Sequence, residues 1–151
     1  MRPNAVKCGF GISRLCFKGI TFIFHHLSPD VLLWVRHFQV VMVETSGRQV
    51  PGCYGSQVKS GDQSLSKPLS LCDAGENHIL VTDYRHHRIH LVTHQLHFVR
   101  HLVAKGHVSN NSVASCGCDD RGITFPRQIC LDGGVLYVGT DSGHIGIYRV
   151  Q

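Results

Sequence analysis

Histidine is the residue type in this sequence most able to do chemistry, because neutral imidazole binds metal ions. The chain has twelve histidines, and six of them lie between residues 86 and 101. Four have the spacing i, i+4, i+7 and i+11, which would align them on one face of a helix: His90, His94, His97 and His101. Two strands and a turn would scatter the same side chains. Whether this segment is a helix or two strands therefore decides whether the four histidines can form a metal site.

Cysteines next to acidic residues form a second candidate cluster, made of Cys116, Cys118, Asp119 and Asp120. This cluster lacks the paired cysteine and histidine order that is typical of structural zinc sites. The seven cysteines of the chain are an odd set without the spacing of a disulfide framework, which indicates reduced thiols and a cytoplasmic location. We expect no metal site and no cofactor.

Two further classes of protein are disfavoured by the sequence. The chain has no G-x-S-x-G nucleophile elbow and no glycine-rich phosphate loop, so nothing in it indicates catalysis. The apolar stretch at 17–43 is interrupted by His25, Pro29, Asp30 and Arg36, whereas a transmembrane helix needs about 20 uninterrupted apolar residues. We expect neither an enzyme nor a membrane partner.

The elements that position these residues are indicated by an internal repeat. Residues 68–92 and 126–150 share one pattern, in which Asp83 matches Asp141, His86 matches His144 and Ile89 matches Ile147. Each copy has short β-branched and aromatic runs separated by Gly, Asp, Asn or His, which is typical of antiparallel strands joined by tight turns. We predict strands at about 68–73, 78–83, 88–93 and 97–103. Four-stranded meanders repeated along a chain are typical of propeller blades.

The first copy also resembles a known family. Its run ILVTDYRHHRI, residues 79–89, is similar to the core of an NHL repeat, in which an apolar strand and an acidic residue precede a short polar turn and Arg-Ile. The second copy departs from this pattern, since Gly146 replaces Arg88. The ending of the chain resembles the C-terminal end of invertebrate tripartite-motif (TRIM) NHL proteins. This resemblance implies an all-β, NHL-type propeller of four-stranded antiparallel blades.

The expected domain organisation is a partial propeller. Residues 1–38 are an unassigned, irregular N-terminal segment, and residues 39–151 are the propeller fragment. Within it we expect the outer strands of one blade at 39–55, a blade at 66–104, and a last blade at 122–151 that lacks a fourth strand. About two and a half blades cannot close a ring. We therefore expect a fragment that needs further blades or another chain.

Basic turns are the best functional lead, because loops on a rigid scaffold collect binding residues. In a meander, the turn between the second and third strands lies on the same face as the loop to the next blade. The predicted partner-binding face consists of Tyr84, Arg85, His86, His87, Lys105, His107 and Arg121. A positive face with an exposed aromatic ring could bind phosphates and stack an unpaired base. NHL propellers bind RNA or protein through such a face, as the resemblance implies.

A rival hypothesis assigns the acidic residues to catalysis. Six-bladed propeller hydrolases hold calcium through carboxylates on the ring axis, and Asp83 or Asp141 could be such ligands. We instead expect each to accept hydrogen bonds from the amides of the following turn. We expect Arg88 to brace its blade through hydrogen bonds between strands.

The sequence thus predicts a non-catalytic protein-interaction module, the partner- or substrate-recruiting piece of a TRIM-like ubiquitin ligase. No RING-type cysteine and histidine ladder is present, so ligase activity would lie in other modules. A single-stranded RNA platform and a calcium-dependent propeller hydrolase fragment remain the alternatives.

Overall fold

The computed structural model describes residues 4–8, 12–17, 20–36, 38–46, 48–55, 61, 63–104 and 123–150. These residues form thirteen strands arranged in three antiparallel sheets. The described part of the chain contains no helix long and apolar enough to cross a membrane. The all-β expectation is confirmed.

The middle sheet is the first copy of the repeat. Its strands are β7 (Pro68–Gly75), β8 (His78–Asp83), β9 (Arg88–Thr93) and β10 (Phe98–Ala104), in the order β10-β9-β8-β7. The turn after β7 requires positive φ angles at Gly75, Glu76 and Asn77 (72°, 48° and 64°), a conformation that glycine and asparagine adopt most readily. All four predicted strands are present, the last shifted by one residue.

The third sheet is the second copy, formed by β11 (Pro126–Asp132), β12 (Val135–Thr140) and β13 (Ile145–Arg149) in sequence order. Among the described residues, no fourth strand pairs with this sheet. Cys130, which matches the buried Cys72 in the repeat, is exposed, because no described sheet covers its side of β11.

The first sheet corrects the expectation of an irregular N-terminal segment. It contains β1 (Asn4–Cys8), β2 (Ile12–Phe17), β3 (Ile20–Ser28), β4 (Val31–Arg36), β5 (Gln39–Glu44) and β6 (Gln49–Tyr54). Pro29 and Asp30, which interrupt the apolar stretch, form the turn between β3 and β4. There the Asp30 carbonyl accepts a hydrogen bond from the Thr45 amide at 2.9 Å. The polar interruptions of this stretch therefore mark a turn between two strands.

This sheet also changes the expected number of blades. The predicted outer strands at 39–55 exist as β5 and β6, but β3 and β4 pair with them to complete a four-stranded unit. The described residues therefore form two four-stranded units and one three-stranded unit, with β1 and β2 extending the first. They form more than the two and a half blades expected from the sequence.

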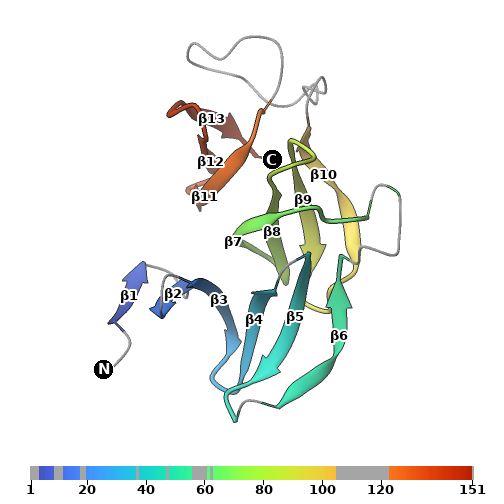
Figure 1. The fold of residues 1–151 in the computed structure, drawn as a ribbon. Helices are drawn as coiled ribbons and strands as arrows, with labels where there is room; N and C mark the ends of the chain where they lie inside the picture. The colour runs from blue at the N-terminus through green and yellow to red at the C-terminus, as the bar shows by residue number, and fades with distance from the viewer. Residues whose placement is uncertain are drawn as a thin grey trace.

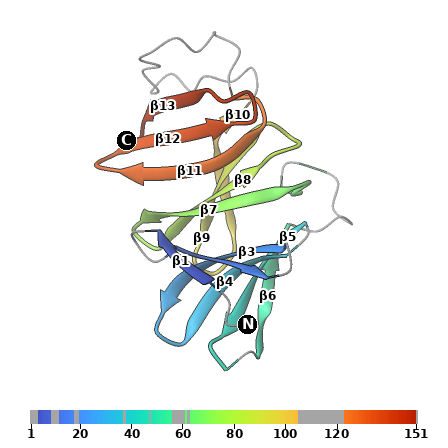
Figure 2. The ribbon, with the colours of Figure 1, turned by 60° about the vertical axis from the view of Figure 1, so that its left-hand side comes forward.

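The three sheets lie in series, with β7 in the middle (Figures 1 and 2). Strand β7 contacts β3 and β4 of the first sheet and β11 of the third. Successive residues of β8 point to opposite faces, as strand geometry requires. Ile79 and Val81 join the core shared with the first sheet, and Leu80 joins the core shared with the third. Both faces of the middle sheet are thus buried.

Candidate partner-binding face

The turn between β8 and β9 is built around Asp83, whose side chain is fully buried. Its Oδ1 accepts hydrogen bonds from the amides of Ser66 (2.9 Å) and Lys67 (3.3 Å). Its Oδ2 lies 2.6 Å from His86 Nδ1. The expectation that Asp83 caps the amides of the following turn was wrong. The donors are amides of the segment that precedes β7, so Asp83 ties that segment to the turn.

Arg88 completes the environment of this carboxylate. Its Nε donates to Asp83 Oδ2 at 3.3 Å, and its Nη2 donates to the Ser64 carbonyl at 2.8 Å. The expected bracing role is confirmed, since the guanidinium joins β8, β9 and the preceding segment. Burial by itself would raise the pKa of Asp83, but the nearby His90 and His86 rings and the hydrogen bond from the Ser66 amide outweigh it and hold the pKa well below its usual range.

His90 extends the network towards the first sheet. The side chain is fully buried, its Nδ1 lies 2.5 Å from the Tyr54 hydroxyl, and its Nε2 lies 3.5 Å from Asp83 Oδ2. Burial lowers the pKa of His90 to about 4, so the ring is neutral at pH 7. The His90 ring therefore links the Tyr54 hydroxyl on one side to the Asp83 carboxylate on the other. Burial likewise raises the pKa of Tyr54.

We predicted that two strands and a turn would separate the four regularly spaced histidines, and the structure separates only some of them. His90 and His101 are partners in the β9–β10 register, with ring centroids 4.6 Å apart. His94 and His97 lie in the turn between these strands. Among the described residues no group of three metal-ligating side chains exists. The cluster at 116–120 lies outside the described residues.

The same turn contacts the third sheet through Tyr84 and His87. The Tyr84 hydroxyl donates to Asp141 Oδ2 at 2.9 Å, and its ring centroid lies 5.1 Å from that of Phe125. His87 packs edge-on against Phe125 at 4.2 Å and accepts a hydrogen bond from the Phe125 amide at 3.0 Å. The turn is therefore held rigidly against the next sheet.

The basic side chains of this region remain exposed around that contact. Arg85 and Lys67 are exposed, and the Lys67 ammonium lies 5.0 Å from the Tyr84 ring centroid, within range of a cation–π interaction. Arg127 is exposed and donates to Asp141 Oδ1 at 2.8 Å. The Phe125 side chain is 42% exposed. Cationic and aromatic groups thus gather where two sheets meet.

We call this surface the basic–aromatic face; it consists of Lys67, Tyr84, Arg85, His86, His87, Phe125 and Arg127. The structure brings together the four predicted residues of the turn, whereas Lys105, His107 and Arg121 lie outside the described residues. Lys67, Phe125 and Arg127 were missed. The sequence repeat could have indicated two of them, because Lys67 and Phe125 occupy matching positions, each directly before the proline at the start of a copy.

Comparisons with known proteins bear on the fold. No protein-family model matches the chain, and no curated protein does. An auxiliary nutrient binding protein from Bacteroides thetaiotaomicron is similar in structure, with a TM-score of 0.51 at 13% sequence identity over 92% of this chain. The chain has a propeller-like fold.

A second similar structure is virginiamycin B lyase from Staphylococcus aureus, with a TM-score of 0.40 and 12% identity over 94% of this chain. The chain spans 42% of the length of the nutrient binding protein and 64% of that of the lyase. At 13% identity the similarity to the nutrient binding protein concerns the fold alone. The NHL type expected from the repeat stays a prediction.

Proposed function

We propose that this chain is a non-catalytic protein-interaction module that binds an acidic segment of a partner protein at the basic–aromatic face. The observation that carries the proposal is the exposed Phe125 ring, which packs against Tyr84 and His87. Lys67 lies over the same Tyr84 ring, and Arg127 binds the Asp141 carboxylate to which Tyr84 donates. An aromatic anchor with cations around it suits a peptide that combines apolar and acidic side chains.

The rigidity of the face supports binding. Asp83, Tyr84 and His87 each make contacts that fix the turn to its neighbours. A surface that is already ordered loses less conformational entropy when a partner docks. The face therefore needs no rearrangement to present its cations.

A protein partner fits this face better than single-stranded RNA does. The Tyr84 ring is already engaged by Lys67 and Phe125, and its hydroxyl by Asp141. A base would have to displace these contacts in order to stack on the ring. RNA remains the alternative because the exposed Phe125 and three cations are also what a nucleic acid contacts.

The resemblance of the first repeat to NHL proteins supports a more specific role. We place the chain in the substrate- or partner-recruiting part of a TRIM-like ubiquitin ligase in the cytoplasm, with transfer chemistry in other modules. The buried Asp83 favours this binding role over the calcium-dependent hydrolase. Its oxygens face the amides of Ser66 and Lys67 and the side chains of His86, Arg88 and His90.

The proposal is tested by removing charge from the face. A fluorescent peptide of glutamate and leucine residues and a fluorescent oligouridylate serve as probes for the full chain in anisotropy titrations. Replacing both Lys67 and Arg85 with Ala should weaken peptide binding roughly tenfold, since each exposed charge contact contributes about 1 kcal/mol or less. The double variant Arg48→Ala/Arg149→Ala removes the same charge elsewhere and should bind as the parent does.

Two results would overturn the proposal. One is equal loss of peptide binding in both double variants, which would show only a net-charge effect. The other is saturable binding of oligouridylate without binding of the peptide, which would assign the face to RNA.

A further inference from the structure

A carboxylate of the chain itself, that of Asp141, already lies in the basic–aromatic face. The Tyr84 hydroxyl donates to its Oδ2 at 2.9 Å, and the Arg127 guanidinium donates to its Oδ1 at 2.8 Å. The two donors come from different sheets, because Tyr84 lies in the turn after β8 and Arg127 lies on β11. Hydrogen bonds to an ionised carboxylate are stronger than those between neutral groups. Tyr84 and Arg127 therefore form a position that binds a carboxylate.

The end of β12 places Asp141 among these donors. In the first copy of the repeat, Asp83 pairs with Pro68 and its side chain is fully buried. In the second copy, the residue that pairs with Pro126 is Thr140, the last residue of β12. Asp141 thus lies one residue beyond the strand, and its side chain is 42% exposed. It is a surface carboxylate on the binding face, unlike the structural carboxylate of Asp83.

The Asp141 side chain can leave this position without disturbing the face. It and the Arg127 side chain are both largely exposed, and ion pairs between exposed side chains contribute little to stability. The Asp141 backbone is fixed separately, because its amide donates to the Phe125 carbonyl at 3.1 Å. His87 still attaches the turn to the third sheet through the Phe125 amide. Only one side chain has to move, and the cations keep their places.

We propose that Tyr84 and Arg127 form a subsite for a side-chain carboxylate of the partner, and that Asp141 is an internal competitor which the partner displaces. This inference rests on the proposed function, since it names the group of the acidic segment that the subsite binds. The exposed Phe125 ring, 5.1 Å from the Tyr84 ring between centroids, contacts an apolar side chain next to that carboxylate. Competition by Asp141 rejects segments that do not make both contacts.

Removing the competitor tests the proposal in anisotropy titrations of the full chain with the glutamate–leucine peptide. Asp141→Ala should tighten binding roughly fivefold, because the partner no longer has to break an exposed ion pair. Asp132→Ala is the matched control. It removes the same charge from an exposed position at the other end of β11 and should change the affinity by less than about twofold, since exposed distant charges are screened.

Deleting the Tyr84 hydroxyl separates displacement from simple charge repulsion. In the parent chain this hydroxyl has a carboxylate partner before the peptide binds, whereas in the Asp141→Ala chain it gains one only in the complex. Tyr84→Phe should therefore weaken peptide binding roughly threefold more in the Asp141→Ala chain than in the parent. If Asp141 only repelled the peptide, Tyr84→Phe would have the same effect in both chains.

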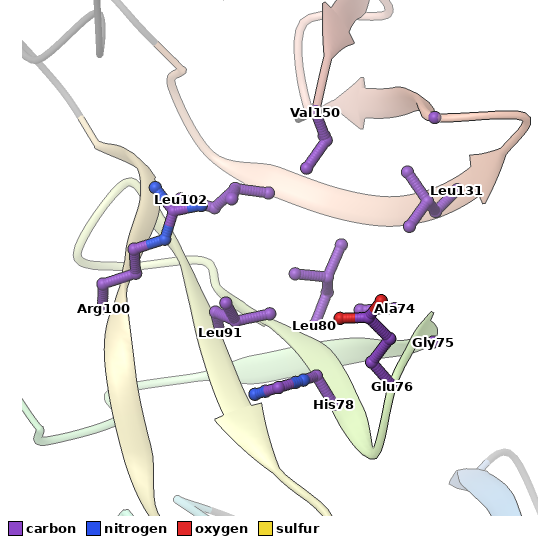
Figure 3. Close-up of a pocket in the computed structure, with 11 residues that line it drawn as sticks. Ala74, Gly75, Glu76, His78, Leu80, Leu91, Arg100, Leu102, Leu131 and Val150 are labelled. Carbon is purple, nitrogen blue, oxygen red and sulfur yellow. The ribbon is translucent and has the colours of Figure 1, made fainter. Parts of the chain in front are cut away.

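The leucines of the peptide have a second apolar surface to bind. A groove of about 450 Å³ lies between the middle and third sheets, and Figure 3 shows Leu91 and Leu102 on one side of it and Leu131 on the other. Arg100 also lines this groove, which shares no residue with the basic–aromatic face. Arg100→Gln should leave peptide affinity unchanged. A loss on Arg100→Gln without a response to Asp141→Ala would place the peptide in the groove and overturn the proposal.

The remaining outcomes distinguish the proposal from the function on which it rests. If the parent binds the peptide and Asp141→Ala binds it equally well, the competitor role is wrong and the proposed function stands. Equal effects of Tyr84→Phe in both chains would also overturn the subsite. A gain on Asp141→Ala for oligouridylate alone would assign the subsite to phosphate. If neither the parent nor Asp141→Ala binds the peptide, the proposed function fails and the subsite fails with it.

Discussion

The two aspartates that match in the repeat behave as different residues. Asp83 is fully buried, and its oxygens face two amides and three side chains. The Asp141 side chain is 42% exposed, and among the described residues its carboxylate contacts Tyr84 and Arg127. The same position in the motif therefore carries a structural carboxylate in one copy and a surface contact in the other.

This difference predicts unequal effects of the same substitution. Asp83→Asn should lower the free energy of unfolding by about 3 kcal/mol, because it leaves Arg88 without its buried counter-charge. Asp141→Asn should change it by less than about 1 kcal/mol, since its ion pair is exposed to solvent. Urea unfolding measures both values. Equal losses would contradict the assignment of distinct roles.

His90 predicts a specific dependence of stability on pH. Its pKa falls from 6.5 to about 4 on folding because of burial, so between these values the unfolded chain binds more protons. Stability should therefore be complete above about pH 6.5 and decrease as the pH falls towards 4. The shift corresponds to at most about 3 kcal/mol.

The measurement compares the parent with His90→Gln, which keeps hydrogen-bonding groups at this position but cannot titrate. Unfolding free energies at about pH 7.5 and about pH 4.5 should differ less in the variant than in the parent. All other ionisable groups are the same in both proteins, so their contributions cancel in the comparison. An identical pH dependence would contradict the buried, neutral state of His90.

At the scale of the strand, the second copy differs from the first where Gly146 replaces Arg88. A Cβ added at Gly146 would lie 2.6 Å from the Tyr148 ring, and Tyr148 is buried in the core shared with the middle sheet. The arginine of the first copy therefore has no room at this position. The ring of Tyr148 uses the space instead.

Gly146→Ala should accordingly lower the free energy of unfolding by about 1–3 kcal/mol, through overpacking against Tyr148. Gly139→Ala is the matched control on β12, because its Cβ would meet Gln128 at an ordinary distance of 3.8 Å. The control should be close to neutral. Thermal unfolding followed by circular dichroism distinguishes them, and a neutral Gly146→Ala would show that the ring moves aside without loss.

At the scale of the molecule, the middle sheet couples its two neighbours because both of its faces are buried. Leu80→Ala creates a cavity on the side of the third sheet and should lower stability by about 2–4 kcal/mol. Trp34, the single tryptophan, lies on β4 of the first sheet. Its fluorescence and the circular dichroism signal should report one shared transition, displaced equally by Leu80→Ala. A tryptophan transition that stays in place would show that the first sheet unfolds independently.

The sequence predicted strands well where the repeat supplied two examples of one pattern, as in β7 to β10. It failed at β3 and β4, where Pro29 and Asp30 were interpreted as interruptions of an apolar stretch. A turn and a break look alike until it is known that the segments on either side pair with each other, as β3 and β4 do. Within the candidate site, the turn at 84–87 was predicted, but Phe125 was not, since its contact with His87 spans 38 residues of sequence.

What the sequence by itself determined is the local alternation that makes strands and turns, and the repeat that makes units of them. These properties depend on interactions between residues close in sequence, so they can be predicted from the sequence alone. The tertiary structure decided which carboxylate is buried and which rings meet at the junction of two sheets. Those outcomes depend on how one sheet packs against the next, and packing brings together residues that no local pattern relates.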